Sequence, residues 1–497
     1  LTPENVGAEF YNTIYYIVES KLKQNTIWVG SDDGLIHLTK NGGKDWENIS
    51  PKHHDEAMIN SIELSPHKEG RAYAAVTGYK LNDTRPYIYK TDNYGKAWYR
   101  IDKNLPNDEY VRVVREDPKK EGLLYAGTEN GIYFSSNNGQ DWHSLQMNLP
   151  NVPVTDLRIR QNNLIVATQG RAFWVLDNLF VIRQFQDDIK EKGIHLFQPD
   201  PTSLLPNSRR AGNFEGKNPN REVPLYYYLK DNQSNHELTI EIYDSSGDKV
   251  KYFSSKESAH DRCIIGNMDP RSPFEINYPK SSNGLNAWHW NMHSENMQCV
   301  EDIALFSGYE GPRVKPGNYK AVIKVGNLAD SITFRIQPDP RVSTNEREVN
   351  DWADQLDITK ETLNSILKET GSIRNTKQKI QNLMQRNQHS ERLQIMAKKA
   401  IDSIDLWQSK ITQLKHQTLE DEDAWETMLA GQLRYLMDVM DRSGPPITDG
   451  SILRLNDLNQ NWELLKIELK MIIENDIQSI NDWVKEQDAP YIDNLLK

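Results

Sequence analysis

The chain has 497 residues, and a single hydrophobic core does not grow to that size, so we expect several domains. It carries 59 Lys and Arg against 71 Asp and Glu, a formal charge of −12, which argues against a nucleic-acid partner because phosphate binding needs clustered cations. No apolar run of about 18 residues occurs, so the sequence predicts no membrane span.

A short cassette occurs three times in the first third of the chain, at Thr39 to Trp46, Thr91 to Trp98 and Ser135 to Trp142. Each copy has a hydroxyl residue, an Asn two places on, a Gly two further on and then a Trp. Asn-x-Gly closes a tight hairpin, and we expect the Trp to fold back over that hairpin as an apolar lid. The cassette residues, which we expect to be structural, are Asn41, Gly43, Trp46, Asn93, Gly95, Trp98, Asn137, Gly139 and Trp142.

Repetition at roughly 40 to 50 residues predicts a propeller or solenoid, whose units must stack to bury their apolar faces. Two short strands, aromatic and β-branched, precede each cassette. A fourth copy over 163–177 keeps the strands and loses the turn. Outer strands are expected at 14–19, 59–64, 111–116 and 155–160, giving four blades of four strands between about residues 11 and 183.

The cassette resembles the Asp-box, or BNR, repeat of sialidase-like and sortilin-like (VPS10-type) β-propellers, with Asn where that motif usually has Asp. Gly170 to Asp177, Gly284 to Asn291 and Lys315 to Tyr319 are also similar to large secreted bacterial proteins described as BNR-repeat, VPS10-like glycosyl hydrolases. The resemblance implies a secreted or cell-envelope location. Because those proteins are usually longer, it also implies that more blades precede Leu1 and that this is the C-terminal portion; a self-sufficient small propeller is the alternative.

The fold class that follows is multidomain: propeller blades, then a β-sandwich, then an α-helical bundle. We expect blades over 1–185 and a connector over 186–224 that begins with a short helix or turn at 186–192. Alternating strands at 225–229, 237–243, 249–253, 287–292, 319–325 and 331–336 predict a sandwich of Ig or FlgD-like type over 225–340. Apolar residues at three- and four-residue spacing over 341–497 predict four antiparallel helices.

Cys263 and Cys299 both fall in the expected sandwich. If the protein is exported, as the resemblance implies, they could form one disulfide; two buried free thiols are the alternative.

Glycoside hydrolysis needs two carboxylates across a cleft, and the candidates near strand ends are Asp32, Asp33, Glu129, Asp156 and Asp177. Asp-Asp-Gly and Glu-Asn-Gly are also what hairpin turns require, and the turn role is favoured for Asp33 and Glu129. The arginine triad of sialidases cannot be assembled from Arg71, Arg158, Arg160 and Arg171.

Binding candidates are fewer. Arg171 lies in a turn between two blade strands, where it could bind an anionic group or pair with Asp177. Tyr79, Tyr94 and Tyr99 are candidates for stacking on a sugar, whereas most other aromatic residues alternate as core residues should. His53, His54, Asp55 and Glu56 form a polar cluster expected to be solvated. No motif for a cofactor or a metal occurs.

We therefore predict a binding or scaffold protein acting on a glycan or on a protein partner, which could be the missing N-terminal part of the same protein. A glycoside hydrolase of sialidase-like or xyloglucanase-like type is one alternative. A sortilin-like peptide-binding ectodomain is another.

Overall fold

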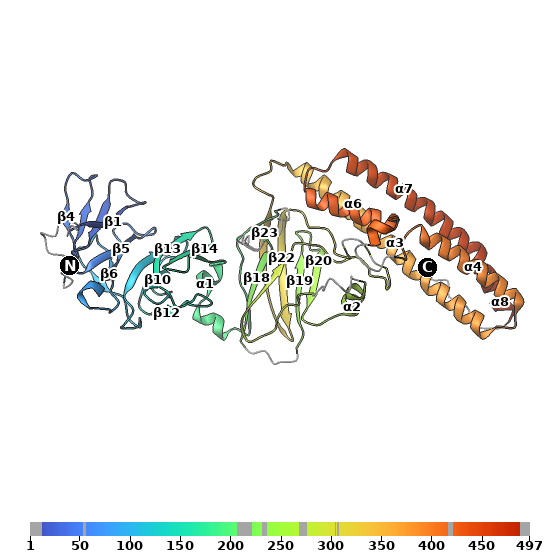
Figure 1. Cartoon of the computed structure of the whole chain (residues 1–497), viewed down its shortest axis with the longest axis horizontal. Helices are drawn as coiled ribbons and strands as arrows, with labels where there is room; N and C mark the ends of the chain where they lie inside the picture. The colour runs from blue at the N-terminus through green and yellow to red at the C-terminus, as the bar shows by residue number, and fades with distance from the viewer. Residues whose placement is uncertain are drawn as a thin grey trace. The chain divides into compact units, whose positions relative to one another are not determined.

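The computed structural model describes residues 12–52, 56–205, 221–230, 236–267, 276–303, 305, 308–415 and 421–487. The expected polar cluster at His53, His54 and Asp55 lies outside these residues. The chain divides into two compact units, Leu1–Phe185 (unit 1) and Gln186–Lys497 (unit 2), which are described separately. The strands lie in unit 1 and in the first half of unit 2, and the long helices follow them (Figure 1).

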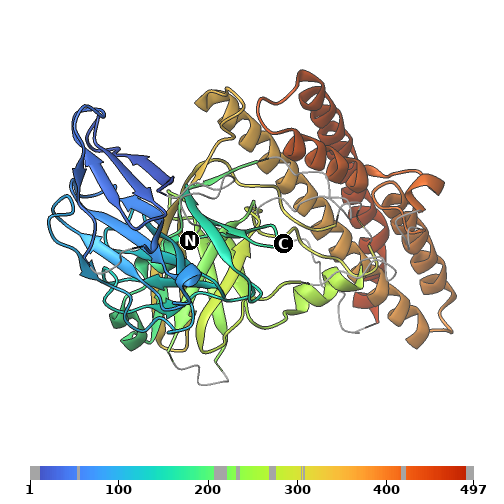
Figure 2. The same cartoon turned by 60° about the vertical axis from the view of Figure 1, so that its left-hand side comes forward.

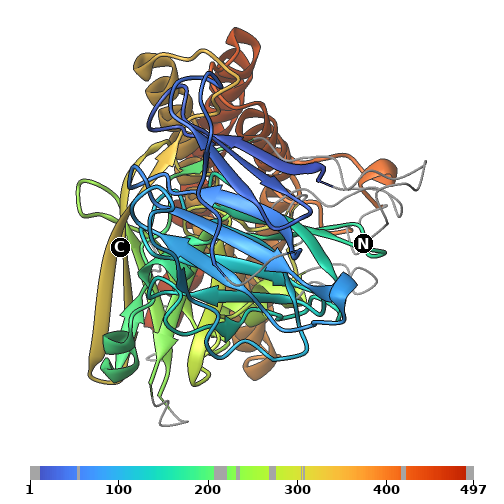
Figure 3. The ribbon, with the colours of Figure 1, turned by 90° about the vertical axis from the view of Figure 1, so that its left-hand side faces the viewer.

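The described part of unit 1 forms four antiparallel sheets, here numbered 1 to 4 in chain order (Figure 3). Sheet 1 has strands β1 (Ile14–Glu19), β2 (Ile27–Ser31), β3 (Ile36–Thr39) and β4 (Glu47–Asn48). Sheet 2 has β5 (Met58–Leu64), β6 (Ala72–Thr77), β7 (Ile88–Thr91) and β8 (Tyr99–Arg100). Sheet 3 has β9 (Val111–Glu116), β10 (Leu124–Thr128), β11 (Ile132–Ser135) and β12 (His143–Ser144).

Sheet 4 has three strands in the described part of the chain, not the four expected: β13 (Val154–Arg160), β14 (Asn163–Thr168) and β15 (Phe173–Leu176). The turn cassette that would lead into a fourth strand is missing from this repeat. The short helix α1 (Phe180–Gln184) follows instead, and its Arg183 forms a buried ion pair with Asp117 of sheet 3.

The first strand of each sheet, expected on the outside, lies where neighbouring sheets meet. The hydroxyl of Ser61 in β5 accepts a hydrogen bond from the amide of Val114 in β9 at 3.4 Å. Arg115 in β9 donates from Nε to the carbonyl of Leu157 in β13 at 2.9 Å. The expectation of outer strands is wrong, because Arg115 on β9 is buried and pairs with Glu63 on β5 and Asp156 on β13, across the neighbouring sheets.

The cassettes form tight turns between the third and fourth strands of sheets 1 to 3. The Asn side-chain oxygen accepts the backbone N–H four residues on, at 3.0 Å for Asn41, 2.9 Å for Asn93 and 3.0 Å for Asn137. Gly43, Gly95 and Gly139 have φ of +92°, +78° and +83°, where a side chain would be strained. Asn accepts this bond as Asp would, so replacing the usual Asp leaves the turn intact.

Two of the cassette Trp residues reach the preceding sheet and do not simply cover their own hairpins. Trp98 donates from Nε1 to the carbonyl of Ile49 in sheet 1, and Trp142 donates to the carbonyl of Ile101 in sheet 2, both at 2.6 Å. A Cβ added to Gly95 or Gly139 would approach Ile49 or Ile101 within 2.7 or 2.6 Å. Each cassette therefore fastens its sheet to the sheet before it.

Unit 2 begins with two sheets that face each other. One has the order β16 (Ile194–Leu196), β18 (Val223–Leu229), β21 (Gly284–Trp290). The other has the order β17 (Thr202–Ser203), β23 (Leu328–Gln337), β22 (Gly317–Val325), β19 (Leu238–Tyr243), β20 (Lys249–Ser254). Trp290 of the first sheet packs edge-on against Phe334 of the second, with ring centroids 6.1 Å apart. Two strands, β16 and β17, come from the segment expected to be only a connector.

Helices α3 (Glu346–Arg386), α4 (Glu391–Ser409), α6 (Leu429–Ser443) and α7 (Asp449–Met471) follow, and α7 continues through a π-helical turn, Ile472–Ile477, into α8 (Gln478–Glu486). The helices lie side by side (Figure 2). The Trp352 indole of α3 donates to the carbonyl of Met440 in α6 at 2.9 Å, and that of Trp407 in α4 donates to the carbonyl of Leu465 in α7 at 2.8 Å. One apolar core runs from the two sheets into these helices. In the described part of the chain, no helix is both long and apolar enough to cross a bilayer.

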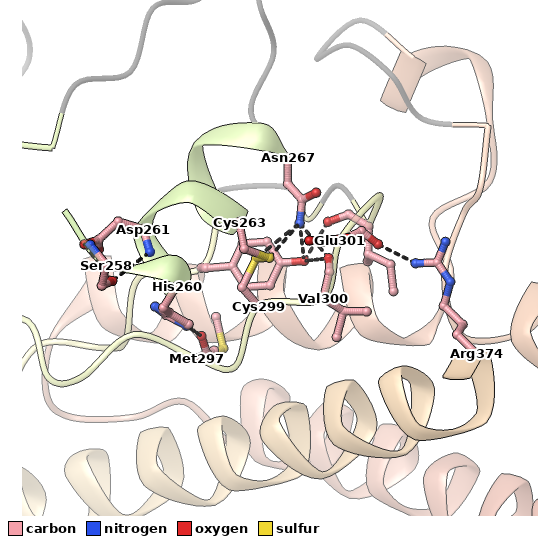
Figure 4. The surroundings of a disulfide bond; sticks show 12 residues. Ser258, His260, Asp261, Cys263, Asn267, Met297, Cys299, Val300, Glu301 and Arg374 are labelled. Atoms are coloured by element: carbon pink, nitrogen blue, oxygen red, sulfur yellow. Dashed lines mark hydrogen bonds between the residues drawn. A yellow bond between two sulfur atoms is a disulfide. The ribbon is translucent and has the colours of Figure 1, made fainter. Parts of the chain in front are cut away.

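Cys263 and Cys299 form a disulfide that joins helix α2 (Ala259–Gly266) to the loop between β21 and β22 (Figure 4).

Candidate functional site

Residues from the first strands of all four sheets meet at Arg115. Its guanidinium donates to Asp156 Oδ1 at 2.6 Å and to the Tyr16 hydroxyl at 3.0 Å, and lies 3.6 Å from Glu63 Oε2. Tyr16 is in β1, Glu63 in β5, Arg115 in β9 and Asp156 in β13. We call these four residues the Arg115 cluster. Only the packing of the four sheets brings them together, because they are up to about 140 residues apart in sequence.

The cluster has a buried side and an accessible side. Arg115 is buried, Glu63 keeps about a fifth of its side-chain surface, and Asp156 keeps nearly half. Burial raises the pKa of Glu63 to about 7, although the charge of Arg115 acts in the opposite direction. Glu63 therefore takes up or releases a proton near neutral pH, while Asp156 accepts a charge-assisted hydrogen bond from the same guanidinium.

Both carboxylates contact one planar guanidinium, so they lie within about 9 Å of each other, and glycosidase carboxylates lie about 5 to 9.5 Å apart. One is largely desolvated with a raised pKa and the other is accessible, a contrast typical of paired acid and base groups. Among the described residues, no three His, Cys, Asp or Glu side chains gather as a metal ion would require.

The sequence candidates other than Asp156 lie elsewhere. The Asp33 carboxylate accepts from the Ser31 hydroxyl within its own turn, and Glu129 is held by Arg112, at 2.9 Å to Nε and 2.6 Å to Nη2. The side-chain amide of Asn163 lies 3.1 Å from Asp177 Oδ1. These three carboxylates occupy separate turns and have local partners.

The binding candidates from the sequence, three Tyr residues and Arg171, have different surroundings. Tyr79 stacks on Tyr110 with centroids 5.0 Å apart, and Tyr99 is exposed on β8. Tyr94 packs over Gly70, and the ammonium of Lys40 lies 4.3 Å from its ring centroid. Arg171 is exposed in the turn between β14 and β15.

Sequence reasoning missed Glu63, Arg115 and Tyr16. The signal was present: the pairing partners of the strands make Val18, Glu63, Arg115 and Arg158 equivalent positions of β1, β5, β9 and β13. Three of these four positions carry a charge, and two of them, Glu63 and Arg115, form an ion pair, whereas Arg158 is exposed.

Known proteins offer only partial similarities. No protein-family model matches the chain. An oligoxyloglucan-reducing end-specific xyloglucanase of Emericella nidulans is 24% identical over 105 residues, which are 20% of this chain and 13% of the xyloglucanase.

Two solved structures are similar over part of the chain. The GH74 xyloglucanase of Xanthomonas campestris covers 33% of this chain and 28% of its own, at 15% identity and a TM-score of 0.27. YCF48 bound to D1 peptide covers 49% of this chain and 69% of its own, at 16% identity and a TM-score of 0.27.

Proposed function

We propose that this chain is a binding and scaffold protein built on part of an Asp-box β-propeller, and that its protein partner supplies a further blade that packs on sheet 1. The blade belongs to the same polypeptide outside this sequence or to another chain. The observation that carries the proposal is that no described residue fills the place next to the first cassette, which we call the empty place.

That place is defined by comparison with the other two cassettes. Trp98 and Trp142 each bond a carbonyl of the preceding sheet, and their glycines pack on Ile49 and Ile101. Trp46 keeps 46% of its surface exposed, and no hydrogen bond of its indole is found among the described residues. A preceding blade would offer Trp46 a carbonyl and Gly43 an apolar side chain, as sheets 1 and 2 do for their successors.

The same face of sheet 1 exposes apolar strand positions that are buried in the other sheets. Strand pairing makes Ile17 equivalent to Ile62, Val114 and Leu157. Ile17 is 65% exposed, whereas the other three are 0% exposed. Burying one such side chain contributes about 1.5–3 kcal/mol, so a blade covering this face would gain several favourable contacts.

The far face of sheet 4 is open in the same way. Phe173 of β15 is equivalent to Ile36, Ile88 and Ile132 by strand pairing. Phe173 is 77% exposed, and the other three are at most 3% exposed. The two open faces are the two halves of the junction that recurs between sheets 1 and 4, so a partner made of the same repeat matches both.

We also propose that the protein works in the cell envelope or outside the cell, because disulfides persist in oxidising compartments. Cys263–Cys299 is the supporting observation. A glycan ligand on unit 1 would find the exposed ring of Tyr99 available for stacking.

Trp46→Ala is expected to lower the free energy of unfolding of the chain by less than about 1 kcal/mol, because the ring is half exposed and makes no junction. Trp142→Ala is the matched variant, and it should cost about 3–5 kcal/mol because that ring is buried between two sheets. Denaturant unfolding followed by circular dichroism measures both. Equal losses in the two variants would contradict an empty place beside sheet 1.

The partner is identified by photo-crosslinking. A benzophenone amino acid replaces Ile17, or replaces the equally exposed Ile395 of α4 as control, in cells that make the protein. We expect position 17, and not position 395, to crosslink to strands that neighbour an Asn-x-Gly-x-x-Trp cassette. Crosslinks only to β15 of a second copy, or none above the control, would overturn the partner blade.

A second candidate function, glycoside hydrolysis, is favoured by the Arg115 cluster, where Glu63 would be the general acid and Asp156 the second carboxylate. The acid form of Glu63 is lost as the pH rises through about 7, so hydrolysis should fall above that pH. Glu63→Gln should reduce sugar release from xyloglucan oligosaccharides about 100-fold or more, and Asp33→Asn should not. Absence of release by the unmodified chain, or equal activity of Glu63→Gln, would rule out this function.

A further inference from the structure

An open pocket of about 640 Å³, lined by polar and charged residues, lies in unit 2, between the loop joining β21 to β22 and helix α3. Helix α2 contributes His260, and the loop contributes Asn296 and Gln298. The volume falls within the range of small-molecule sites, about 300–1,000 Å³. None of the residues that line the pocket is part of the Arg115 cluster, which is in unit 1.

The loop that forms one wall is tied down at consecutive residues (Figure 4). The disulfide fixes Cys299, and Gln298 donates its backbone N–H to Asn364 Oδ1 of α3 at 2.9 Å. The remaining ties are His260 Nε2 to the Met297 carbonyl at 3.0 Å, Asn267 Nδ2 to the Val300 carbonyl at 2.7 Å, and Arg374 to the Glu301 carbonyl. A wall fixed in this way holds its side chains ready for a ligand at little entropic cost.

The hydrogen bonds within the wall also determine which donor and acceptor atoms remain available to a ligand. Asn296 Oδ1 accepts from Lys251 at 2.7 Å, and Asn364 Oδ1 accepts from the Gln298 amide, which leaves both side-chain NH₂ groups as donors. His260 donates from Nε2 to a carbonyl, so its Nδ1 is an acceptor when the ring is neutral. The pocket wall thus offers both donors and acceptors.

The other wall, on α3, adds Ser365, Lys368 and Glu369. Neither Lys368 nor Glu369 forms an ion pair with the described residues, and Glu369 Oε2 is buried with no hydrogen-bond partner among them. The formal charges of the lining cancel, with His260 counted as neutral.

We propose that this pocket binds a neutral saccharide. A hydroxyl both donates and accepts, so a few adjacent hydroxyls can serve the Glu369 carboxylate, the imidazole and the two amides at once. An anion would be repelled by the Glu369 carboxylate, and an apolar ligand would leave the NH₂ groups of Asn296 and Asn364 without an acceptor. A zwitterion is a poorer fit because Lys368 and Glu369 are consecutive on a helix and their head groups diverge.

The experiment is calorimetric titration of the full chain with cellotetraose, maltotetraose, mannotetraose, chitotetraose and a xyloglucan heptasaccharide, with glycylglycine as the zwitterionic probe. We expect at least one saccharide to bind with a dissociation constant of about 1 mM or tighter. Glu369→Gln should weaken that binding about tenfold, as should the exposed Gln298→Ala. Glu361→Gln, on the same helix and exposed, is the matched control and should bind as the parent does.

Unchanged melting temperatures in the variants show that the loss is at the site. Failure of every saccharide to bind overturns the proposal, as does binding that Glu369→Gln and Gln298→Ala leave intact. Binding of glycylglycine in place of the saccharides overturns the ligand class. None of these outcomes depends on the partner blade of unit 1.

Discussion

Arg115→Met is expected to destabilise unit 1 by about 3–5 kcal/mol, because it leaves two carboxylates without the cation that they share. The substitution also removes the hydrogen bond to the Leu157 carbonyl, which ties sheet 3 to sheet 4, and the bond to the Tyr16 hydroxyl of sheet 1. Denaturant unfolding should show an earlier first transition, and hydrogen exchange should speed up in β5, β9 and β13.

The loss should depend on pH with a definite sign. The folded pKa of Glu63 is raised to about 7, so its ionised form is disfavoured on folding, and stability from this group is present below its unfolded value and lost as the pH rises through about 7. Arg115→Met removes the charge that opposes this shift, so the variant should lose more stability at pH 8 than at pH 5. Arg158→Met, on the equivalent but exposed position of β13, is the control and should change stability by less than about 0.5 kcal/mol. A loss of that small size in Arg115→Met would show that the cluster is not a junction.

The cassettes show what the sequence could determine. Their turns depend on residues at most four apart, so an Asn, a hydroxyl and a Gly at fixed spacing were sufficient to predict them. The hydrogen-bond partners of the Trp residues were not predictable in the same way. Ile49 and Ile101 belong to other sheets and lie about 40 to 50 residues away in sequence. A short segment of sequence determines the hydrogen bonds within a turn, whereas contacts between sheets depend on how the repeats stack.

The Arg115 cluster was missed for the same reason. The alternation of apolar and polar residues along β5, β9 and β13 predicted the strands but not their positions within each sheet. Charged residues on a strand are usually solvated, so these strands were expected on the outside. Here Glu63, Arg115 and Asp156 offset one another's charge, so the strand could be placed inside. The empty place at Trp46 likewise became visible only when the cassettes could be compared as packed structures.

The largest expected effect in unit 2 comes from the ion pair between Arg313 and Asp441, which joins the loop before β22 to helix α6. Arg313 Nε lies 2.9 Å from Asp441 Oδ1, Nη1 donates to the Leu205 carbonyl at 3.0 Å, and Nη2 donates to the Asp441 carbonyl. Both side chains are more than nine-tenths buried. Asp441→Leu should therefore lower the free energy of unfolding of unit 2 by about 3–5 kcal/mol, since it leaves a guanidinium buried without its carboxylate.

The double variant Arg313→Met, Asp441→Leu distinguishes the pair's own contribution from the cost of an unpaired charge. Replacing a buried pair by apolar residues is often neutral, so the double variant should recover most of the loss, while Arg442→Met, in an exposed pair on the same helix, should cost at most about 1 kcal/mol. Hydrogen exchange measured by mass spectrometry at increasing denaturant gives separate signals for β22 in the sheets and for α6 in the helices. Because one apolar core joins the sheets to the helices, both signals should be lost together in Asp441→Leu. Loss of the helical signal alone would mean that the sheets of unit 2 fold without the helices and that the Arg313–Asp441 pair only docks them.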